Sequence, residues 1–351
     1  MLTPLHRRCW TEERKVEFGN ACPGGMVNNS WMQVPTGYVV ENGAFFPDDW
    51  IKIIFKSVVL VRFPHMLLGA YLTGAFCVAA TGAWYLLRTT YHAEAKVMLA
   101  MGLGLAAVLV PVQLFFGHLN GRYVAKYQPS KMAAIEARWD DEKPASEVLI
   151  AWPDVENRRN LYAITLPTPF GSLIDSDSLS AGEVGLNSIP KENWPPVLIP
   201  FFTFRIMVGC GLAMLALAWL GTFLRLRGRI ERNRLVLWLV FLSFPLPFIA
   251  ILTGWYTAEV GRQPWVVYGV LRTADAMTPF LTARAASISL LVFGAIYTFI
   301  FAFGIFYIYR LLRAGPAGRL IKAPAYAVPS RPMSLADEGL TSETKYMGAG
   351  E

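Results

Sequence analysis

Residues 254–265 read G-W-Y-T-A-E-V-G-R-Q-P-W, and this stretch closes an apolar run that carries no charge over residues 235–258. Glu259 and Arg262 follow the run three residues apart, so they share one face if the helix continues. Pro264 disfavours helical backbone at the residue before it, where we expect the helix to end. A carboxylate and a guanidinium at the mouth of a membrane helix can bind polar groups of a cofactor or relay protons. A salt bridge that ties off the helix end is the simpler alternative.

The composition around this stretch is that of a membrane protein. Of the 351 residues, 54% are hydrophobic and only 16% are charged, whereas soluble domains carry about a quarter of charged residues. We therefore expect an all-α polytopic membrane protein in contact with the lipid bilayer. The net charge is +7, but Lys and Arg stand mostly at the ends of apolar runs. This distribution favours membrane orientation over nucleic-acid binding.

Five apolar runs predict about five transmembrane helices, at residues 63–87, 97–116, 197–223, 235–258 and 285–309. Pro245 and Pro247 predict a kink in the fourth. The segment from Trp50, interrupted by charges, is expected at the membrane interface. These runs divide the chain into a polar, irregular leader (1–28), a loop and interfacial segment (29–62), two spans (63–116), a long polar loop (117–195), three spans (196–312) and a disordered tail (313–351).

The arginine and lysine counts predict the orientation. Five arginines lie between the third and fourth spans, at positions 225, 227, 229, 232 and 234, and more basic residues follow the fifth. Such clusters mark the cytoplasmic side. The tail is then cytoplasmic and the loop over residues 117–195 is external. No apolar segment in the first thirty residues indicates a signal peptide, and the four cysteines have no metal-ligand spacing.

Among the four histidines, only His65 stands near the start of a clean apolar run. An ionisable group there is a functional candidate, and neutral imidazole is the commonest metal ligand. The alternative is a histidine bonded to a carbonyl at the helix end. His92 and His118 are expected in turns at span ends, where they would be interfacial.

Pro200 suits a first helical turn, so the helix that carries Met207 begins shortly before that residue. The helix of His65 enters the membrane from the same face. Methionines in membrane helices usually pack, but a His/Met pair on two facing helices can hold a low-spin heme iron. Arg205 lies inside the same apolar run and needs an anionic partner, which a heme propionate would supply. Since Arg205 and Met207 are about 200° apart around the helix, spacing alone does not place both on one heme.

Within the long loop, P-S-K-M-A-A-I-E-A-R-W-D (residues 129–140) predicts a short helix with Ser130 as its N-cap. Lys131 and Glu136 flank an apolar stripe formed by Met132, Ile135 and Trp139. A strip edged by a donor and an acceptor can grip a flat quinol ring, with Glu136 accepting its proton. An amphipathic helix on the membrane surface is the alternative.

The opening stretch resembles the G-W-x-x-A-E-x-G-R-Q-P-W signature of subunit I of the cytochrome bd quinol oxidases. Other segments resemble the same family in the same order: N-S-W-M-Q (29–33), F-P-H (63–65), K-M-A-A-I-E-A-R-W (131–139) and F-R-I-M-V-G-C-G (204–211). The resemblance covers residues 29–315. It implies a subunit of a quinol:oxygen oxidoreductase of the bacterial inner membrane, whose partners are quinol, oxygen and oxidase subunit II.

The resemblance also implies roles for single residues. His65 and Met207 become the axial ligands of low-spin heme b, and Arg205 stabilises that heme. Lys131 and Glu136 lie in the quinol-oxidation loop.

Glu259, with Arg262, falls near the pair of high-spin heme b and heme d that reduces oxygen in the full family enzyme. The short loop is more like the compact-loop, cyanide-insensitive branch.

The number of spans departs from the family pattern. Subunit I has nine spans, and the missing helices carry a histidine ligand of a high-spin heme and the glutamates of the proton path. We therefore expect the C-terminal portion of such a subunit, a truncated gene product with a non-native leader. The alternative is a non-catalytic membrane remnant that binds no complete heme set. A small transporter is a weaker alternative, because no inverted repeat is visible.

Overall fold

The computed structural model describes residues 22–41, 44–141, 147–166, 184–276 and 281–315. The expectations for residues 1–21 of the leader and for residues 316–351 of the tail lie outside this part of the chain. Two compact units make up the chain, Met1–Gly294 and Ala295–Glu351. All of the geometry below belongs to the first unit, except where α10 (Ala283–Ala314), which crosses the boundary, is named.

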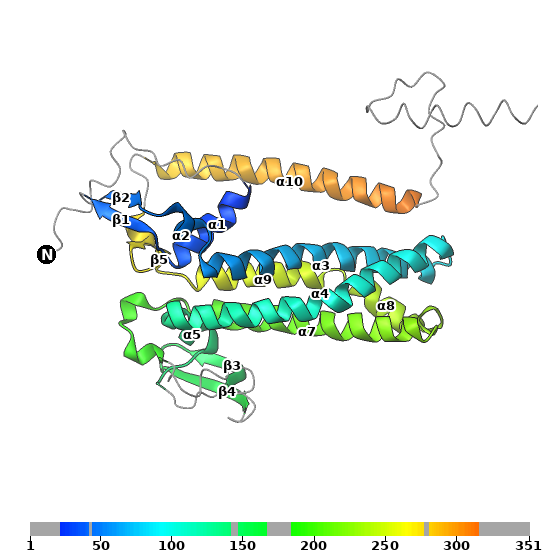
Figure 1. The fold of residues 1–351 in the computed structure, drawn as a ribbon, viewed down its shortest axis with the longest axis horizontal. Helices are drawn as coiled ribbons and strands as arrows, with labels where there is room; N and C mark the ends of the chain where they lie inside the picture. Colours follow the sequence, from blue (N-terminus) through cyan, green and yellow to red (C-terminus); the bar gives the residue numbers. More distant parts are fainter. Residues whose placement is uncertain (1–21, 42–43, 142–146, 167–183, 277–280, 316–351) are drawn as a thin grey trace, which may run out of the picture. The chain divides into compact units, whose positions relative to one another are not determined.

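The first unit contains a bundle of long helices, α3 (Ser57–Leu87), α4 (His92–Tyr127), α7 (Leu198–Leu226), α8 (Arg234–Leu242) and α9 (Leu246–Val260) (Figure 1). Both α3 and α7 pack against α4 on one side and against α9 on the other. The helices α3 and α7 therefore face each other across the bundle. With α10, the described residues hold five segments long and apolar enough to cross a membrane, which confirms the five predicted spans.

The predicted kink in the fourth span is a full break. The helix α8 ends at Leu242, and α9 begins at Leu246 after a short turn. Pro245 is the N-cap of α9 and Pro247 lies in its first turn, where a proline removes no helical hydrogen bond. The prolines thus start a new helix rather than bend an old one.

Two predicted helix boundaries were wrong. The helix α3 begins at Ser57, inside the segment expected at the interface. Arg62 is accommodated there because its Nη2 donates to Asn29 Oδ1 at 2.9 Å. The helix α4 continues to Tyr127, so His118 lies inside a helix and not in a turn. Hydropathy predicts only the apolar part of a span, whereas the helix continues as long as its backbone hydrogen bonds continue.

Small residues let α3 and α4 approach closely. A Cβ atom added to Gly102 would lie 2.6 Å from the carbonyl oxygen of Ala75, and one added to Gly82 would lie 2.8 Å from that of Ala95. Close backbone approach of this kind is typical of membrane helix pairs. Buried side chains fill the middle of the bundle between α3, α4 and α7, namely Leu72, Ala75, Phe76, Ala106, Val110, Met214 and Ala218.

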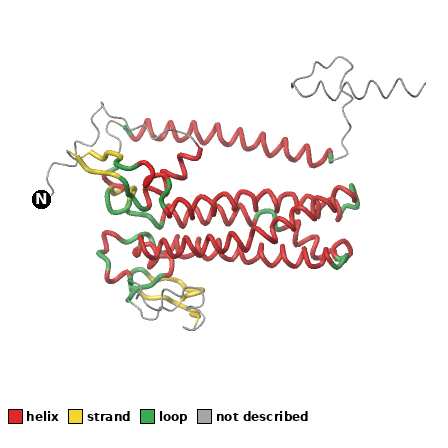
Figure 2. The backbone as a smooth tube through the Cα atoms, in the orientation of Figure 1, coloured by secondary structure: helices red, strands yellow, loops and turns green. Residues whose placement is uncertain are grey.

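The connections carry the remaining elements (Figure 2). They are α1 (Cys22–Gln33), the hairpin of β1 (Tyr38–Glu41) and β2 (Ala44–Pro47), α2 (Trp50–Ile54), α5 (Pro129–Glu136), the hairpin of β3 (Glu147–Asp154) and β4 (Arg159–Leu166), and the pair β5 (Trp265–Val267) and β6 (Leu271–Arg272). Short 3-10 turns lie at Leu186–Ser188, Lys191–Asn193, Ile230–Arg232 and Thr273–Asp275. The fold is mainly helical as predicted, and the strands of the described residues form only two-stranded antiparallel hairpins.

These connections correct three further expectations. The leader was expected to be irregular to residue 28, but α1 starts at Cys22. The polar loop was expected from residue 117, but its first part belongs to α4. The predicted helix at residues 129–140 ends at Glu136, and Gln128 rather than Ser130 occupies its N-cap position, because Pro129 supplies its first turn.

Candidate functional site

The predicted site residues gather at one end of the bundle. This is the end where α3 and α7 begin and where α4 and α9 finish, next to α1 and α5. His65 lies near the start of α3, Met207 near the start of α7 and Glu259 near the end of α9. The chain order therefore brings residues almost 200 positions apart to one level of the bundle.

His65 lies against a glycine of α4. A Cβ atom added to Gly117 would lie 3.3 Å from Cε1 of the imidazole. The ring nitrogen Nε2 is 3.4 Å from Nε2 of Gln113, and the other nitrogen, Nδ1, is buried without a hydrogen-bond partner among the described residues. A buried imidazole nitrogen without a partner is costly unless something binds it. The alternative of a histidine bonded to a carbonyl finds no support in these contacts.

Met207 also lies against a glycine, the first residue of the stretch 254–265. A Cβ atom added to Gly254 would lie 2.8 Å from Sδ of Met207. The thioether is therefore turned toward α9, whereas His65 is turned toward α4. The structure brings the two side chains to the same end of two facing helices and gives each a close glycine neighbour.

Arg205 is held by backbone carbonyls. Its guanidinium donates to the carbonyl oxygens of Ile135 at 2.8 Å and Leu149 at 2.8 Å, and also to those of Phe201 and Val148. The carbonyls belong to α5, β3 and α7, so one side chain fastens the hairpin and the short helix to the bundle. The sequence predicts an anionic partner for Arg205, and these carbonyls are a second way to hold a cation in an apolar run.

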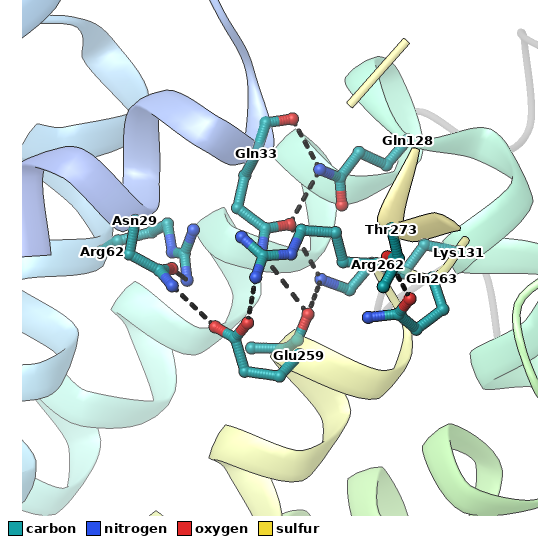
Figure 3. Close-up of polar contacts among 10 residues, drawn as sticks. Asn29, Gln33, Arg62, Gln128, Lys131, Glu259, Arg262, Gln263 and Thr273 are labelled. Atoms are coloured by element: carbon teal, nitrogen blue, oxygen red, sulfur yellow. Dashed lines mark hydrogen bonds and ion pairs between the residues drawn. The ribbon is translucent and has the colours of Figure 1, made fainter. Parts of the chain in front are cut away.

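Glu259 and Arg262 form a salt bridge, the simpler of the two alternatives that the sequence left open. Arg262 Nη2 lies 2.5 Å from Glu259 Oε2, although Arg262 follows the end of α9. The other carboxylate oxygen accepts from Asn29 Nδ2 at 2.7 Å, and Asn29 in turn binds Arg62. Figure 3 shows these four side chains converging from α1, α3 and the end of α9.

Lys131 belongs to the same polar cluster. Its Nζ donates to the carbonyl oxygen of Ala258 at 3.0 Å and to Gln33 Oε1 at 3.3 Å, and Gln128 Nε2 binds the same Gln33 oxygen at 2.8 Å (Figure 3). Gly261 makes room for the lysine, since a Cβ atom there would lie 3.1 Å from its Cε and Cγ atoms. The pKa of Lys131 is lowered to about 7, mainly by burial. The positive charges of Arg62 and Arg262 also lower this pKa, whereas the negative charge of Glu259 raises it.

We call the set of Asn29, Gln33, Arg62, Gln128, Lys131, Glu259 and Arg262 the polar cluster. It contains three basic side chains and one carboxylate. Two donors of Arg262, Nε and Nη1, are buried and have no hydrogen-bond partner among the described residues. This excess of donors and of positive charge suits an anionic group such as the carboxylate of a cofactor.

Glu136 occupies a different environment. It forms a salt bridge with Arg138, and the two side chains are 13% and 4% exposed. Both line a cleft of about 250 Å³ together with Trp139 and residues of β4 such as Arg159 and Asn160. Ser130, Lys131, Ala133, Ala134 and Ile135 of α5 are buried, which argues against a helix lying exposed on a membrane surface. Lys131 and Glu136 thus face two sites, one on each side of α5.

Several polar residues of these sites were not singled out from the sequence. Asn29 and Gln33 were noticed only as part of a motif, although their spacing of four puts both on one face of a helix. Arg62 stands three residues before His65, and a charge that close to an apolar run was itself a signal. Arg138 could have been inferred as a partner for Glu136.

The described residues contain no metal site made of several typical ligand side chains. They hold no group of three or more His, Cys, Asp or Glu side chains placed to bind a metal ion. A pair of one histidine and one methionine is a smaller donor set than such a group. The candidate donors for a heme iron are therefore His65 and Met207, each of which lies close to a glycine of a neighbouring helix.

Comparisons with known proteins agree on one family. The family profile described as "Cytochrome bd terminal oxidase subunit I" matches residues 26–316. The "Cytochrome bd ubiquinol oxidase subunit 1" of Bacillus subtilis is 33% identical over 299 residues, which is 82% of this chain and 63% of that protein. The "Cytochrome bd-II ubiquinol oxidase subunit 1" of Escherichia coli is 28% identical, over 84% of this chain and 70% of that protein.

A solved structure has the same arrangement of helices. The bd oxidase from Geobacillus thermodenitrificans superimposes with a TM-score of 0.74 at 29% sequence identity, and the match covers 84% of this chain and 67% of that one. The chain spans less than two thirds of the length of the Bacillus subtilis relative.

Proposed function

Because the chain belongs to the cytochrome bd terminal oxidase subunit I family, we propose that it is the electron-entry part of a quinol:oxygen oxidoreductase. In this proposal it oxidises quinol at the outer face of a bacterial inner membrane, next to low-spin heme b. The tail and the arginine-rich turn then lie in the cytoplasm, and the β3–β4 hairpin lies outside. Reduction of oxygen at a high-spin heme b and heme d, and assembly with subunit II, belong to the complete enzyme.

The observation that carries the proposal is the placement of His65 and Met207. They lie at one end of the bundle on two facing helices, each against a glycine, and the imidazole keeps a buried nitrogen that has no hydrogen-bond partner among the described residues. An imidazole and a thioether together fit a low-spin heme iron. The heme supplies one-electron redox chemistry, and the two side chains would hold its iron. Arg205, two residues before Met207 in the chain, would stabilise this heme, as the family resemblance implies.

Glu136 is the proposed proton acceptor for the quinol. It lines the cleft of about 250 Å³ beside Trp139, whose ring offers an apolar surface for a flat substrate. Arg138 holds the carboxylate in place and stabilises its ionised form. An ionised carboxylate at the substrate hydroxyl removes a proton as electrons leave the quinol.

The polar cluster is the proposed contact with the high-spin side. Glu259 is held by Asn29 and Arg262 at a fixed position at the end of α9. Lys131 lies beside it and has a pKa near neutrality, so it can gain or release a proton at physiological pH. These residues would bind anionic groups and hold a proton near Glu259.

A reduced-minus-oxidised visible spectrum of the chain purified in detergent tests the proposal. We expect a low-spin b-type band that is lost in His65→Ala and in Met207→Leu. Met214→Leu is the matched control, because Met214 lies two turns further along α7 in the packed middle of the bundle, and it should keep the band. His118→Ala controls for the loss of a histidine.

The spectrum also separates the proposal from its alternative. Well-folded, monodisperse protein without any heme band would support a non-catalytic membrane remnant. A band that survives in both His65→Ala and Met207→Leu would refute the assigned ligands while leaving heme binding intact.

A further inference from the structure

The opposite end of the bundle carries a second charged site that the proposed oxidase function does not use. Between α7 and α8 lies an open cleft of about 510 Å³, lined by Leu224, Arg229, Arg232, Asn233 and Arg234. We call it the arginine cleft. Ile230 is 4% exposed and packs into the core between α3, α4 and α8, so the turn that bears these arginines is anchored rather than free.

The arginine cleft has positive charge without a matching carboxylate. The only acidic residue between Arg225 and Arg234 is Glu231, and its carboxylate pairs with Lys96 of α4 at 2.9 Å. Within the described part of the chain, no carboxylate pairs with the three arginines that line the cleft. The N-terminus of α8 begins at Arg234 and adds the positive end of a helix dipole. The site is built for an anion with several acceptor oxygens.

The surroundings of the arginine cleft are typical of the level of lipid head groups. Leu226 and Leu235, at the two ends of the arginine-rich turn, are 78% and 70% exposed. Trp84 packs against Trp238 and Phe241 at the same end of the bundle, and Arg88 lies 4.4 Å from the Trp84 ring. Aromatic residues with basic neighbours mark the interface between the apolar membrane and water. Exposed leucines beside arginines suit a ligand that has both acyl chains and a phosphate.

We propose that the arginine cleft binds the phosphate of an anionic membrane lipid. The guanidinium groups of Arg229, Arg232 and Arg234 take the phosphate oxygens, and the acyl chains lie along the exposed leucines. Basic pockets between membrane helices on the cytoplasmic side commonly bind such head groups. The ligand would join the turn to α8, which is the part of the fourth span that is separated from α9 by the helix break.

Native mass spectrometry of the full chain in detergent tests this inference. The probes are dioleoylphosphatidylglycerol, dioleoylphosphatidylcholine and inorganic phosphate. We expect phosphatidylglycerol to bind at least about tenfold more tightly than phosphatidylcholine. A hydrogen bond from an arginine to the phosphate is worth about fivefold in affinity. The triple variant Arg229→Gln/Arg232→Gln/Arg234→Gln, which removes three such contacts, should therefore lose about 100-fold.

The matched control removes the same charge from the same end of the bundle. Arg88→Gln/Arg225→Gln/Arg227→Gln spares the cleft, and it should weaken phosphatidylglycerol by less than about fivefold. Equal losses in the two triple variants would overturn the site in favour of general charge attraction. Equal binding of the two lipids would also overturn it. Displacement of the lipid by inorganic phosphate at equal affinity would assign the cleft to a soluble phosphate instead.

A measurement on the unaltered chain covers the case in which the triple variant does not fold. A photoactivatable phosphatidylglycerol is crosslinked to the protein in membranes, and the labelled peptides are identified. Label is expected on residues 224–239, and label confined to other segments would refute the inference. Neither measurement depends on heme or on oxidase activity, so the failure of the proposed function would leave this test intact.

Discussion

Replacement of Lys131 by methionine removes a buried amine and leaves a chain of similar length. Lys131 is 4% exposed, and burial lowers its pKa from 10.5 to about 7. Between these two values the unfolded chain binds a proton that the folded chain does not hold. The free energy of unfolding of the natural protein therefore rises with pH in this window. Lys131→Met lacks this dependence.

The size of the effect follows from the two pKa values. Each pH unit above 7 adds about 1.4 kcal/mol to the stability of the natural protein relative to Lys131→Met. Between pH 6 and pH 9 the difference should change by about 3 kcal/mol in favour of the natural protein. Below pH 7 the folded protein holds a buried charge, so the methionine variant should there have its greatest relative advantage.

Equilibrium unfolding in detergent by increasing dodecyl sulfate, followed by tryptophan fluorescence at pH 6, 7, 8 and 9, measures this difference. Lys191→Met is the control for the loss of one positive charge, because Lys191 lies in an exposed turn away from the polar cluster. A difference between the natural protein and Lys131→Met that stays constant over this range would refute the reasoning. Lys131 would then keep its proton in the folded protein throughout.

Three further variants test the packing and the contacts described above. Gly102→Ala should destabilise the chain by about 1–3 kcal/mol in the same assay because its Cβ atom meets the backbone of α3, whereas Gly104→Ala, which has open space, should be neutral or stabilising. Glu259→Gln should cost about 3 kcal/mol by leaving Arg262 without its carboxylate. The double variant with Arg262→Met should recover part of this loss, and additive losses would contradict the pair. Arg205→Lys keeps the charge but loses carbonyl contacts, so hydrogen exchange should accelerate in the β3–β4 hairpin, and unchanged exchange there would contradict the clamp.

The membrane part of the fold was largely predictable because the apolar runs are long and nearly uncharged. Each of the five predicted runs matches one of the five segments of the described residues that are long and apolar enough to cross a membrane, and the fourth consists of the two helices α8 and α9. The ends of the helices were predicted poorly, and α4 shows why. Its last residues include His118, Asn120 and Arg122, which are polar side chains on a helix whose backbone hydrogen bonds continue. Hydropathy predicts a helix only as far as the apolar side chains extend, which is residue 116, eleven residues before the helix ends at Tyr127.

The site residues could be predicted from residue identity and family resemblance, but the side chains that contact them could not. Lys131 and Glu136 lie five residues apart and were predicted to edge one strip, but α5 is buried and directs them to different sites. Lys131 turns to Gln33 and to the carbonyl of Ala258, whereas Glu136 turns to Arg138. No spacing rule on a single helix can reveal this, because the partners come from α1 and α9.

The stretch 254–265 explains how one short segment can organise this end of the bundle. Its two glycines face two candidate site residues, since Gly254 meets the sulfur of Met207 and Gly261 meets the side chain of Lys131. The residues between them supply a carbonyl to Lys131 and the carboxylate of Glu259 to α1. Larger side chains at either glycine would push the thioether or the amine away without changing any polar group. The glycines of this motif are therefore as necessary to the arrangement as its glutamate and arginine, because they set the distances at which α5, α7 and α9 meet.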